Sequence, residues 1–247
     1  MLDHQPLRNK TALITGGAAR LGAMSARFLH AAGATVVIHY RRSADEAQKL
    51  QQELNQLRRD SAFLVQGDLL DFATLPRLVD ACLEHTGHLD VLLNNASNFF
   101  PTPVEQVTED QWDSLFGVNA KAPFFLARAA AAELRKSAGC IVNMVDIHAE
   151  RPHKNHPVYS MAKAANAMMV KALARELAPE IRVNGVAPGA ILWPEGNEAA
   201  KHQALPRIPL ERAGRPENIA RTVLFLATAE YITGQIIAVD GGRSVQQ

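Results

Sequence analysis

Short runs of aliphatic and β-branched residues alternate with longer runs of helical period along the whole chain, and this alternation limits the fold more than any other feature. Apolar runs without polar alternation are typical of parallel strands that are buried on both faces. Helices that connect such strands make right-handed crossovers. We therefore expect an α/β fold with a doubly wound, seven-stranded parallel sheet. The predicted strands are 11–15, 35–39, 62–65, 89–93, 139–145, 181–186 and 236–239.

The length of 247 residues suits one hydrophobic core, so we expect a single domain over residues 1–247. Helices are predicted at 20–32, 43–59, 72–86, 108–116, 122–136, 159–178 and 216–228. Residues 187–215 are irregular and rich in proline and glycine. Long irregular segments inside compact domains are often functional. We expect residues 190–215 to form a lid over a ligand, although a mobile surface loop explains the composition equally well.

Charge and cysteine content exclude several classes of protein. The 26 basic and 25 acidic side chains nearly balance, which argues against nucleic-acid or membrane-surface partners. No apolar run approaches the ~20 residues of a membrane span, and the N-terminus does not resemble a signal peptide. Cys82 and Cys140 form neither a metal-binding spacing nor a disulfide framework. We therefore expect a cytoplasmic protein.

A glycine-rich turn follows the first predicted strand and opens the first predicted helix. It reads Thr15-Gly-Gly-Ala-Ala-Arg-Leu-Gly22, so Gly16, Arg20, Leu21 and Gly22 are candidate cofactor contacts. Small residues allow the backbone to approach a pyrophosphate, and the first N–H groups of the helix face the anion. A tight structural turn is the alternative. The position between a strand and a helix favours a Rossmann-type dinucleotide site.

The second strand ends without the acidic residue that NAD-specific sites place there to bind the ribose 2′-hydroxyl. Basic and polar side chains stand at this point instead, and Arg20 is expected to join them around a 2′-phosphate. The sequence therefore predicts NADPH as the cofactor. The adenine end would be completed by Asp68 and Leu69, although Asp68 is equally suited to cap a nearby helix. The residues at the strand end are His39, Tyr40, Arg41, Arg42 and Ser43.

Tyr159 and Lys163 are four residues apart, so they share one face of a predicted helix. A nearby ammonium favours the phenolate, and we therefore expect the pKa of Tyr159 to fall towards neutrality. Such a tyrosine would be a usable general acid. A pair at this spacing is usually a surface pair, but here it follows a predicted sheet strand. Asn119 begins a helical run, where it would cap the helix or hold a proton-relay water.

These motifs together resemble the short-chain dehydrogenase/reductase family over essentially the whole chain. The resemblance implies that Tyr159 donates the proton, that Lys163 lowers its pKa and binds the nicotinamide ribose, and that Asn119 completes a proton relay. It also implies a homotetramer whose interfaces involve residues 121–136, 159–178 and the C-terminal segment. The further matching positions are Asn94-Asn-Ala96 with cofactor contacts Asn95 and Ala96, Pro188-Gly189, and Asp240-Gly-Gly242.

Two positions depart from the family pattern. Arg20 stands where the glycine loop normally has glycine, and Asp146 stands where the catalytic serine is expected, 13 residues before Tyr159. A carboxylate would repel the oxyanion that develops when a carbonyl is reduced. It can instead accept an N–H group, and a carbon–nitrogen double bond needs a proton on nitrogen. The substitution therefore favours an imine-type substrate such as a pterin.

A second resemblance, to pteridine reductases, rests on Arg20-Leu-Gly22, His39-Tyr-x-Arg42-Ser43, Asn94-Asn-Ala-Ser97 with Phe99, and Asp146. It implies that Phe99 stacks on the pterin and that Ser97 contacts the pterin or a cofactor phosphate. The function predicted is NADPH-dependent reduction of dihydropterins, extending to dihydrofolate or oxidised pterins. The alternatives are a ketone or 3-oxoacyl thioester reductase and a non-catalytic NADPH-binding regulator. Leu192 and Trp193 of the lid would close the pocket.

A histidine cluster follows the fifth predicted strand. The spacing of His153 and His156 is compatible with metal binding, but no acidic or thiol partner has convincing spacing. We predict no metal.

Overall fold

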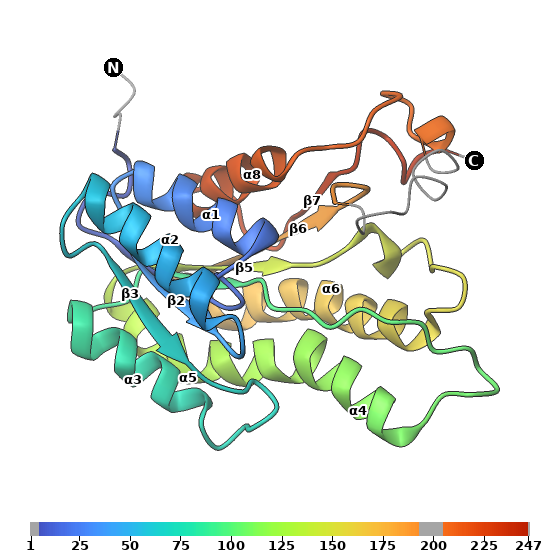
Figure 1. The fold of residues 1–247 in the computed structure, drawn as a ribbon, viewed down its shortest axis with the longest axis horizontal. Coiled ribbons are helices and arrows are strands. Elements are labelled where there is room, and N and C mark those ends of the chain that lie inside the picture. The colour runs from blue at the N-terminus through green and yellow to red at the C-terminus, as the bar shows by residue number, and fades with distance from the viewer. Residues whose placement is uncertain (1–4, 193–204, 247) are drawn as a thin grey trace.

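The computed structural model describes residues 5–192 and 205–246. One sheet of seven parallel strands runs through it in the order β3-β2-β1-β4-β5-β6-β7, which confirms the predicted α/β fold (Figure 1). The strands are β1 (Thr11–Ile14), β2 (Thr35–Tyr40), β3 (Ala62–Gln66), β4 (Val91–Asn94), β5 (Cys140–Met144), β6 (Arg182–Pro188) and β7 (Ile236–Val239).

Helices cover both faces of the sheet (Figure 1). One face carries α1 (Arg20–Ala31), α2 (Ala44–Leu57) and α8 (Pro216–Thr228), and the other carries α3 (Leu75–Thr86), α5 (Ala122–Lys136) and α6 (Pro157–Leu177). Each layer has its own apolar core, represented by Leu29 and Leu50 on the first face and by Leu75 and Leu126 on the second. Burial on both faces explains why the central strands are continuously apolar.

Five boundaries differ from the predictions by more than a residue, namely the starts of β4, α3 and α6 and the ends of α2 and β6. Local hydrogen bonds account for the first two. β4 begins at Val91 rather than 89, because the Asp90 carboxylate accepts hydrogen bonds from the Thr11 N–H (2.8 Å) and from Lys10 Nζ (2.9 Å). α3 begins at Leu75 rather than 72, because residues before it form turns closed by the Thr74 N–H donating to the Asp71 carbonyl.

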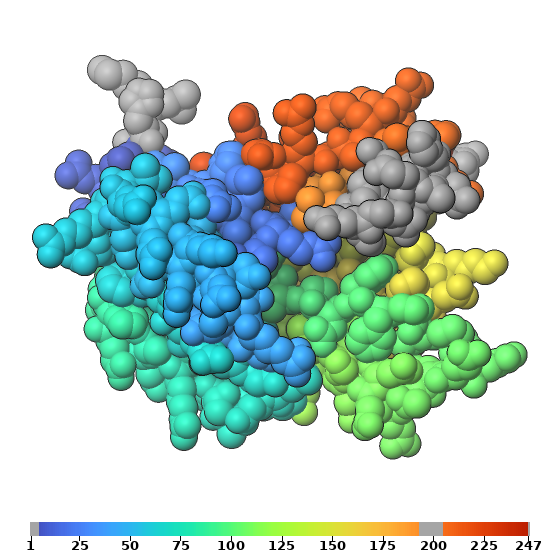
Figure 2. Space-filling model, viewed as in Figure 1, coloured from blue at the N-terminus to red at the C-terminus, as the bar shows by residue number. Residues whose placement is uncertain are grey.

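The chain crosses between the two layers at the centre of the sheet, where β1 lies between β2 and β4. Ile14 pairs with Ile38 on one side and with Leu93 on the other, so the ends of three strands are level. The connection after β1 leads to one side of the sheet and the connection after β4 leads to the other. This divergence opens a crevice at the carboxyl edge of the sheet. The space-filling view shows a hollow there, where the blue N-terminal segments meet the green middle of the chain (Figure 2).

Short irregular helices carry several polar residues towards this crevice. A π-helix (Gly117–Lys121) joins α4 (Glu109–Phe116) to α5, and a 3₁₀-helix (Ile147–Ala149) follows β5. Neither was predicted.

Of the predicted lid at 190–215, the structure describes residues 190–192 and 205–215, and Trp193 lies outside the described residues. A 3₁₀-helix (Leu205–Arg207) leads to the buried Ile208. The Leu210 N–H then donates to the Gly241 carbonyl at 3.1 Å, so this segment packs on the C-terminal turn.

Candidate active site

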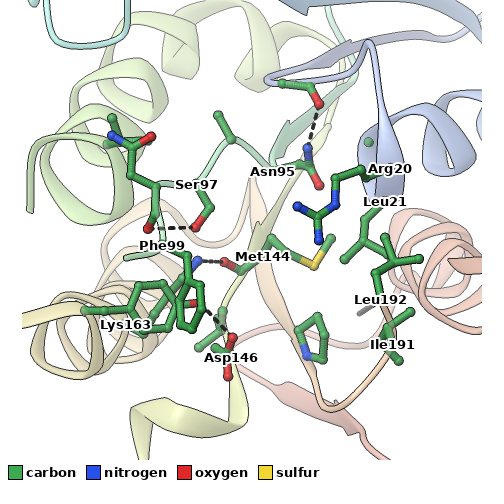
Figure 3. Close-up of a pocket in the computed structure, with 18 of the residues that line it drawn as sticks. Arg20, Leu21, Asn95, Ser97, Phe99, Met144, Asp146, Lys163, Ile191 and Leu192 are labelled. Atoms are coloured by element: carbon green, nitrogen blue, oxygen red, sulfur yellow. Dashed lines mark hydrogen bonds between the residues drawn. The ribbon is translucent and has the colours of Figure 1, made fainter. Parts of the chain in front are cut away.

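A cavity of about 760 Å³ opens at the carboxyl ends of the central strands. Figure 3 shows Arg20, Leu21, Ile191 and Leu192 on one side of it, facing Ser97, Phe99 and Lys163 across the space. Most of the predicted site residues line this cavity: Gly16, Arg20, Leu21, Gly22, His39, Arg41, Asp68, Leu69, Asn95, Ala96, Ser97, Phe99, Asp146, Tyr159, Lys163, Pro188, Gly189 and Leu192. Lining residues that sequence reasoning missed include Met144, Ile191, Arg207 and Arg243.

The glycine loop is packed so tightly that side chains at Gly16 and Gly22 would collide with neighbouring atoms. Gly16 has φ +58°, and a Cβ added at Gly22 would lie 2.2 Å from the Gly16 carbonyl oxygen. The Asn95 amide donates to the carbonyls of Thr15 and Gly16, both at 2.9 Å, and so fixes the loop against the end of β4. The loop precedes α1, whose first N–H groups face this space. These features fit the pyrophosphate of a dinucleotide.

His39 holds the glycine loop in place, and it also lines the cavity in which it was predicted to bind cofactor. Its Nδ1 accepts the Gly16 N–H at 3.2 Å, so the proton must be on Nε2, which donates to the Gly67 carbonyl at 3.2 Å. Burial lowers the pKa of His39 to about 4. The neutral ring therefore connects the glycine loop to the end of β3.

Only some of the residues predicted to surround the 2′-phosphate line the cavity. Arg20, at φ +53°, and Arg41 both line the cavity, and Arg41 lies 3.7 Å from the Asp68 carboxylate. Asp68 accepts the Leu70 N–H at 3.0 Å and does not cap α3, which begins at Leu75.

The remaining members of that group, Tyr40, Arg42 and Ser43, are not among the described residues that line the cavity. Tyr40 packs against the core, and the Ser43 side chain makes no capping hydrogen bond to α2.

Tyr159 and Asp146 form the closest polar contact of the site. The Tyr159 hydroxyl donates to Asp146 Oδ2 at 2.7 Å, while Oδ1 of the same carboxylate accepts the His148 N–H at 2.9 Å. Burial raises the pKa of Tyr159 well above its ordinary value, and the Asp146 charge and hydrogen bond raise it further. The predicted fall in the pKa of Tyr159 is therefore wrong for this arrangement, since the carboxylate favours the protonated phenol.

Lys163 is completely buried beside this pair. Its Nζ donates to the Met144 carbonyl at 2.8 Å and lies 5.7 Å from the centroid of the Tyr159 ring (Figure 3). Burial lowers the pKa of Lys163 to about 8, against the opposing influence of Asp146. The phenol is hydrogen-bonded to the carboxylate and the ammonium to a backbone carbonyl, so after burial it is Asp146 and not Lys163 that shifts the pKa of Tyr159.

Asn119 lies inside the π-helix, and it neither starts nor caps a helix as the sequence suggested. Its amide Nδ2 donates to the carbonyls of Asn98 (2.9 Å) and Leu115 (3.0 Å), and its Oδ1 accepts the Ser97 hydroxyl at 2.7 Å. Ser97 lies close enough to Tyr159 to offset part of the rise in the pKa of the phenol. Ser97 therefore lies between Asn119 and Tyr159 in the cavity wall.

A chain of buried asparagines continues behind Asn119. Asn166 Nδ2 donates to the Asn119 carbonyl (2.7 Å), Asn143 Nδ2 donates to Asn166 Oδ1 (3.0 Å), and Asn94 Nδ2 donates to Asn143 Oδ1 (2.9 Å). All four residues are at most 3% exposed. Asn143 and Asn166 were missed, although an amide in an otherwise apolar strand or helix face is a signal that could have identified them.

Phe99 is 55% exposed at the mouth of the cavity. Its ring meets Tyr159 edge-on, with centroids 4.8 Å apart, and stacks on His156 at 4.5 Å. A flat ligand ring beside Tyr159 would therefore meet an aromatic side chain there.

Within the described residues no group of three or more His, Cys, Asp or Glu side chains is arranged to hold a metal ion. The described helices include none that is long and apolar enough to cross a membrane.

Comparison with known proteins agrees with this geometry. A family model described as enoyl-(acyl carrier protein) reductase matches residues 17–244. The chain is 40% identical to pteridine reductase 1 of Leishmania tarentolae, over 95% of this chain and 96% of the relative. It is 36% identical to versicolorin reductase of Emericella nidulans, over 97% of each chain, and 34% identical to the short chain dehydrogenase mdpC of the same organism, over 98% of each. The chain therefore belongs to the short-chain dehydrogenase/reductase family of oxidoreductases, whose members use a nicotinamide cofactor.

Proposed function

We propose that this protein catalyses NADPH-dependent reduction of dihydropterins to their tetrahydro forms, and extends this activity to dihydrofolate or oxidised pterins. The observation that carries the proposal is the 2.7 Å hydrogen bond between the Tyr159 hydroxyl and the Asp146 carboxylate in the cavity wall. This pair combines a proton donor with an acceptor for substrate N–H groups, which is the combination that a pterin ring requires.

The residues of the cavity fit NADPH. Gly16 and Gly22 allow the tight loop whose backbone would approach its pyrophosphate, and Arg20 and Arg41 supply cations for the 2′-phosphate. Lys163 is available to hold the nicotinamide ribose. When bound, the cofactor supplies the hydride.

The chain's own residues would deliver the proton. Tyr159 holds its proton firmly, because burial and Asp146 keep its pKa high. A pterin nitrogen that gains electron density can take this proton. The family resemblance implies that Asn119 takes part in the relay that reprotonates the tyrosine, and the Ser97 hydroxyl donates to Asn119 Oδ1 beside it. Asp146 meanwhile accepts a pterin N–H group and orients the ring, and Phe99 provides a face for stacking.

Reduction of a ketone or 3-oxoacyl thioester is the competing function, and names such as versicolorin reductase among the relatives favour it. A carboxylate at position 146 weighs against it, because a developing oxyanion would lie beside a negative charge. The pteridine reductase relative, at 40% identity, supports the pterin assignment. A non-catalytic NADPH-binding regulator is the third candidate, and the assembled Tyr159–Lys163 site weighs against that role.

The test is NADPH oxidation with a panel of dihydropterins, dihydrofolate, ketones and 3-oxoacyl thioesters. We expect turnover of pterins, and we expect Asp146→Ser and Phe99→Ala to lower kcat/KM for pterins at least about tenfold while ketone reduction is retained or improved. Turnover of ketones alone would overturn the proposal in favour of carbonyl reduction. Absence of turnover with every substrate would favour the regulator.

The same proposal includes a homotetramer. Phe124 on α5 and Met161 and Met168 on α6 are 43%, 44% and 63% exposed, and such apolar side chains on helix faces suit contacts with other subunits. Cys82 and Cys140 are free and buried, which is compatible with the cytoplasm.

A further inference from the structure

Three histidines form an aromatic cluster beside the catalytic pair. The ring centroids of His148 and His153 are 4.8 Å apart, and those of His153 and His156 are 4.6 Å apart, with planes within 25° of parallel. His156 stacks on Phe99, which in turn contacts Tyr159. The cluster therefore continues the aromatic surface of the active site outwards from Tyr159.

Hydrogen bonds to the backbone fix two of these rings. His148 Nδ1–H donates to the Arg151 carbonyl and His156 Nδ1–H donates to the Lys154 carbonyl, both at 2.8 Å. The carbonyls can only accept, so the Nε2 atoms of both rings remain available. Within the described residues these Nε2 atoms have no protein partner. Both rings are thus held in position with one nitrogen that can contact a ligand.

Arg243 brings a permanent positive charge to the same end of the cavity. It lies in the C-terminal turn, where the Asp240 carboxylate accepts the N–H groups of Gly242 (2.9 Å) and Ser244 (2.6 Å). Arg243 lines the cavity together with His148 and His153, and its charge helps to lower the pKa of His153 after burial and the two neighbouring histidines. Among the described residues, no carboxylate lies within ion-pair distance of Arg243.

The cavity therefore has two basic ends. Arg20 and Arg41 lie at the glycine loop and β2, and the 2′-phosphate of the proposed cofactor requires only that end. Arg243 follows β7, and His148 and His153 follow β5, so these lining residues come from the other half of the sheet. The Asp146 carboxylate on that side is already bound to Tyr159 and to the His148 N–H. The charge of Arg243 is thus left for a ligand.

We propose that His153 and Arg243 form a subsite for a carboxylate on the substrate, so that the enzyme prefers pterins that carry an aromatic linker and an acidic tail, the folate class, over pterins with neutral side chains. This proposal rests on the proposed function. The cavity lining offers a partner for each part of such a molecule: Tyr159, Asp146 and Phe99 for the pterin, the stacked rings of His148 and His153 for an aromatic linker, and Arg243 for the carboxylate. A guanidinium binds a carboxylate through two parallel N–H donors, and the histidine rings stack on flat groups.

The test compares dihydrofolate with dihydrobiopterin, which has the same reacting ring and a neutral side chain. We measure kcat/KM with saturating NADPH for the wild type, Arg243→Gln and His153→Gln. Arg77→Gln is the matched control, because Arg77 is exposed on α3 and does not line the cavity. The dissociation constants of folate and biopterin from the enzyme loaded with the oxidised cofactor, which has no hydride to transfer, provide a second readout that does not need turnover.

We expect Arg243→Gln to lower kcat/KM for dihydrofolate about tenfold, in line with a lost charge-assisted hydrogen bond. His153→Gln should act in the same direction, and both variants should leave dihydrobiopterin within about twofold. High salt should reduce the preference for dihydrofolate in the wild type only. Equal losses for both pterins, or no change in their ratio, would overturn the subsite while the proposed function stands. A wild type that reduces neither pterin would overturn both.

Discussion

The Tyr159 hydroxyl and the Asp146 carboxylate lie 2.7 Å apart, with the tyrosine as donor. The two residues come from different elements, since Asp146 caps the 3₁₀-helix after β5 and Tyr159 lies in the first turn of α6. A proton donor and an anion are thus held together in a buried site. Their contact keeps the tyrosine protonated, and the substrate has to compete with the carboxylate for that proton.

Removing the charge of Asp146 should make Tyr159 more acidic. In Asp146→Asn the pKa of Tyr159 should fall, because the carboxylate raises it through both its charge and its hydrogen bond. Ultraviolet difference titration of tyrosinate measures this change, and Tyr159→Phe identifies the signal among the three tyrosines of the chain. An unchanged or higher pKa in Asp146→Asn would contradict the assignment.

The buried asparagine chain should stabilise both the fold and the site. Asn166→Leu would remove the Asn166 amide from the Asn119 carbonyl and would leave the Asn143 amide with only the weak acceptor Met169 Sδ at 3.7 Å. We expect a loss of about 3 kcal/mol in the free energy of unfolding, together with a fall in kcat as Asn119 shifts. Urea denaturation measures the first effect. Met168→Leu, at an exposed position of the same helix, should change stability by less than about 0.5 kcal/mol. A similarly small loss in Asn166→Leu would show that the chain has no stabilising role.

Much of this site could be predicted from the sequence, because parallel strands place their carboxyl ends at one edge of a sheet. The glycine loop after β1, Asn95 after β4 and Asp146 after β5 meet for this reason alone. The helical spacing likewise placed Tyr159 and Lys163 on one face of α6.

The remaining features depend on distances between segments that the sequence does not specify. The helical spacing predicted that Lys163 lies near Tyr159, but it gave no indication that Nζ binds the Met144 carbonyl or that the Tyr159 hydroxyl binds Asp146. The predicted direction of the pKa of Tyr159 was wrong because burial and this carboxylate both raise it. The sequence also did not indicate that Arg243 lines the cavity, because this depends on how the C-terminal turn packs at the end of the sheet.

Selectivity for NADPH should depend on Arg41 and hardly on Arg42. Arg41 lines the cavity, whereas Arg42 is not among the described lining residues. We expect Arg41→Gln to raise the KM for NADPH about tenfold, with little effect on NADH, since one charge-assisted phosphate contact is lost. Steady-state kinetics with both cofactors measure the ratio, and Arg42→Gln is the matched control. Equal effects of the two substitutions would indicate a diffuse electrostatic contribution.

His39 should make the protein sensitive to acid. Its folded-state pKa of about 4 lies below the ordinary value of 6.5, so the unfolded chain binds more protons between these values. Stability should therefore fall by up to about 3 kcal/mol as the pH decreases from 6.5 to 4. The free energy of unfolding of His39→Gln should lose this component of the pH dependence. Parallel pH profiles for the wild type and the variant would contradict the neutral, buried assignment of the ring.

Lys163 should have a signature of the same sign at alkaline pH. Burial lowers its folded-state pKa from 10.5 to about 8, so between these values the unfolded chain keeps a proton that the native state has released. The free energy of unfolding contributed by this residue should therefore rise with pH, by up to about 3 kcal/mol between pH 8 and 10.5. Lys163→Met removes the titrating group, so the difference in unfolding free energy between wild type and variant isolates it. Urea denaturation of the cofactor-free protein across this range is the measurement. A difference that is independent of pH would mean that the ammonium stays charged in the native protein, held by Asp146 and the Met144 carbonyl.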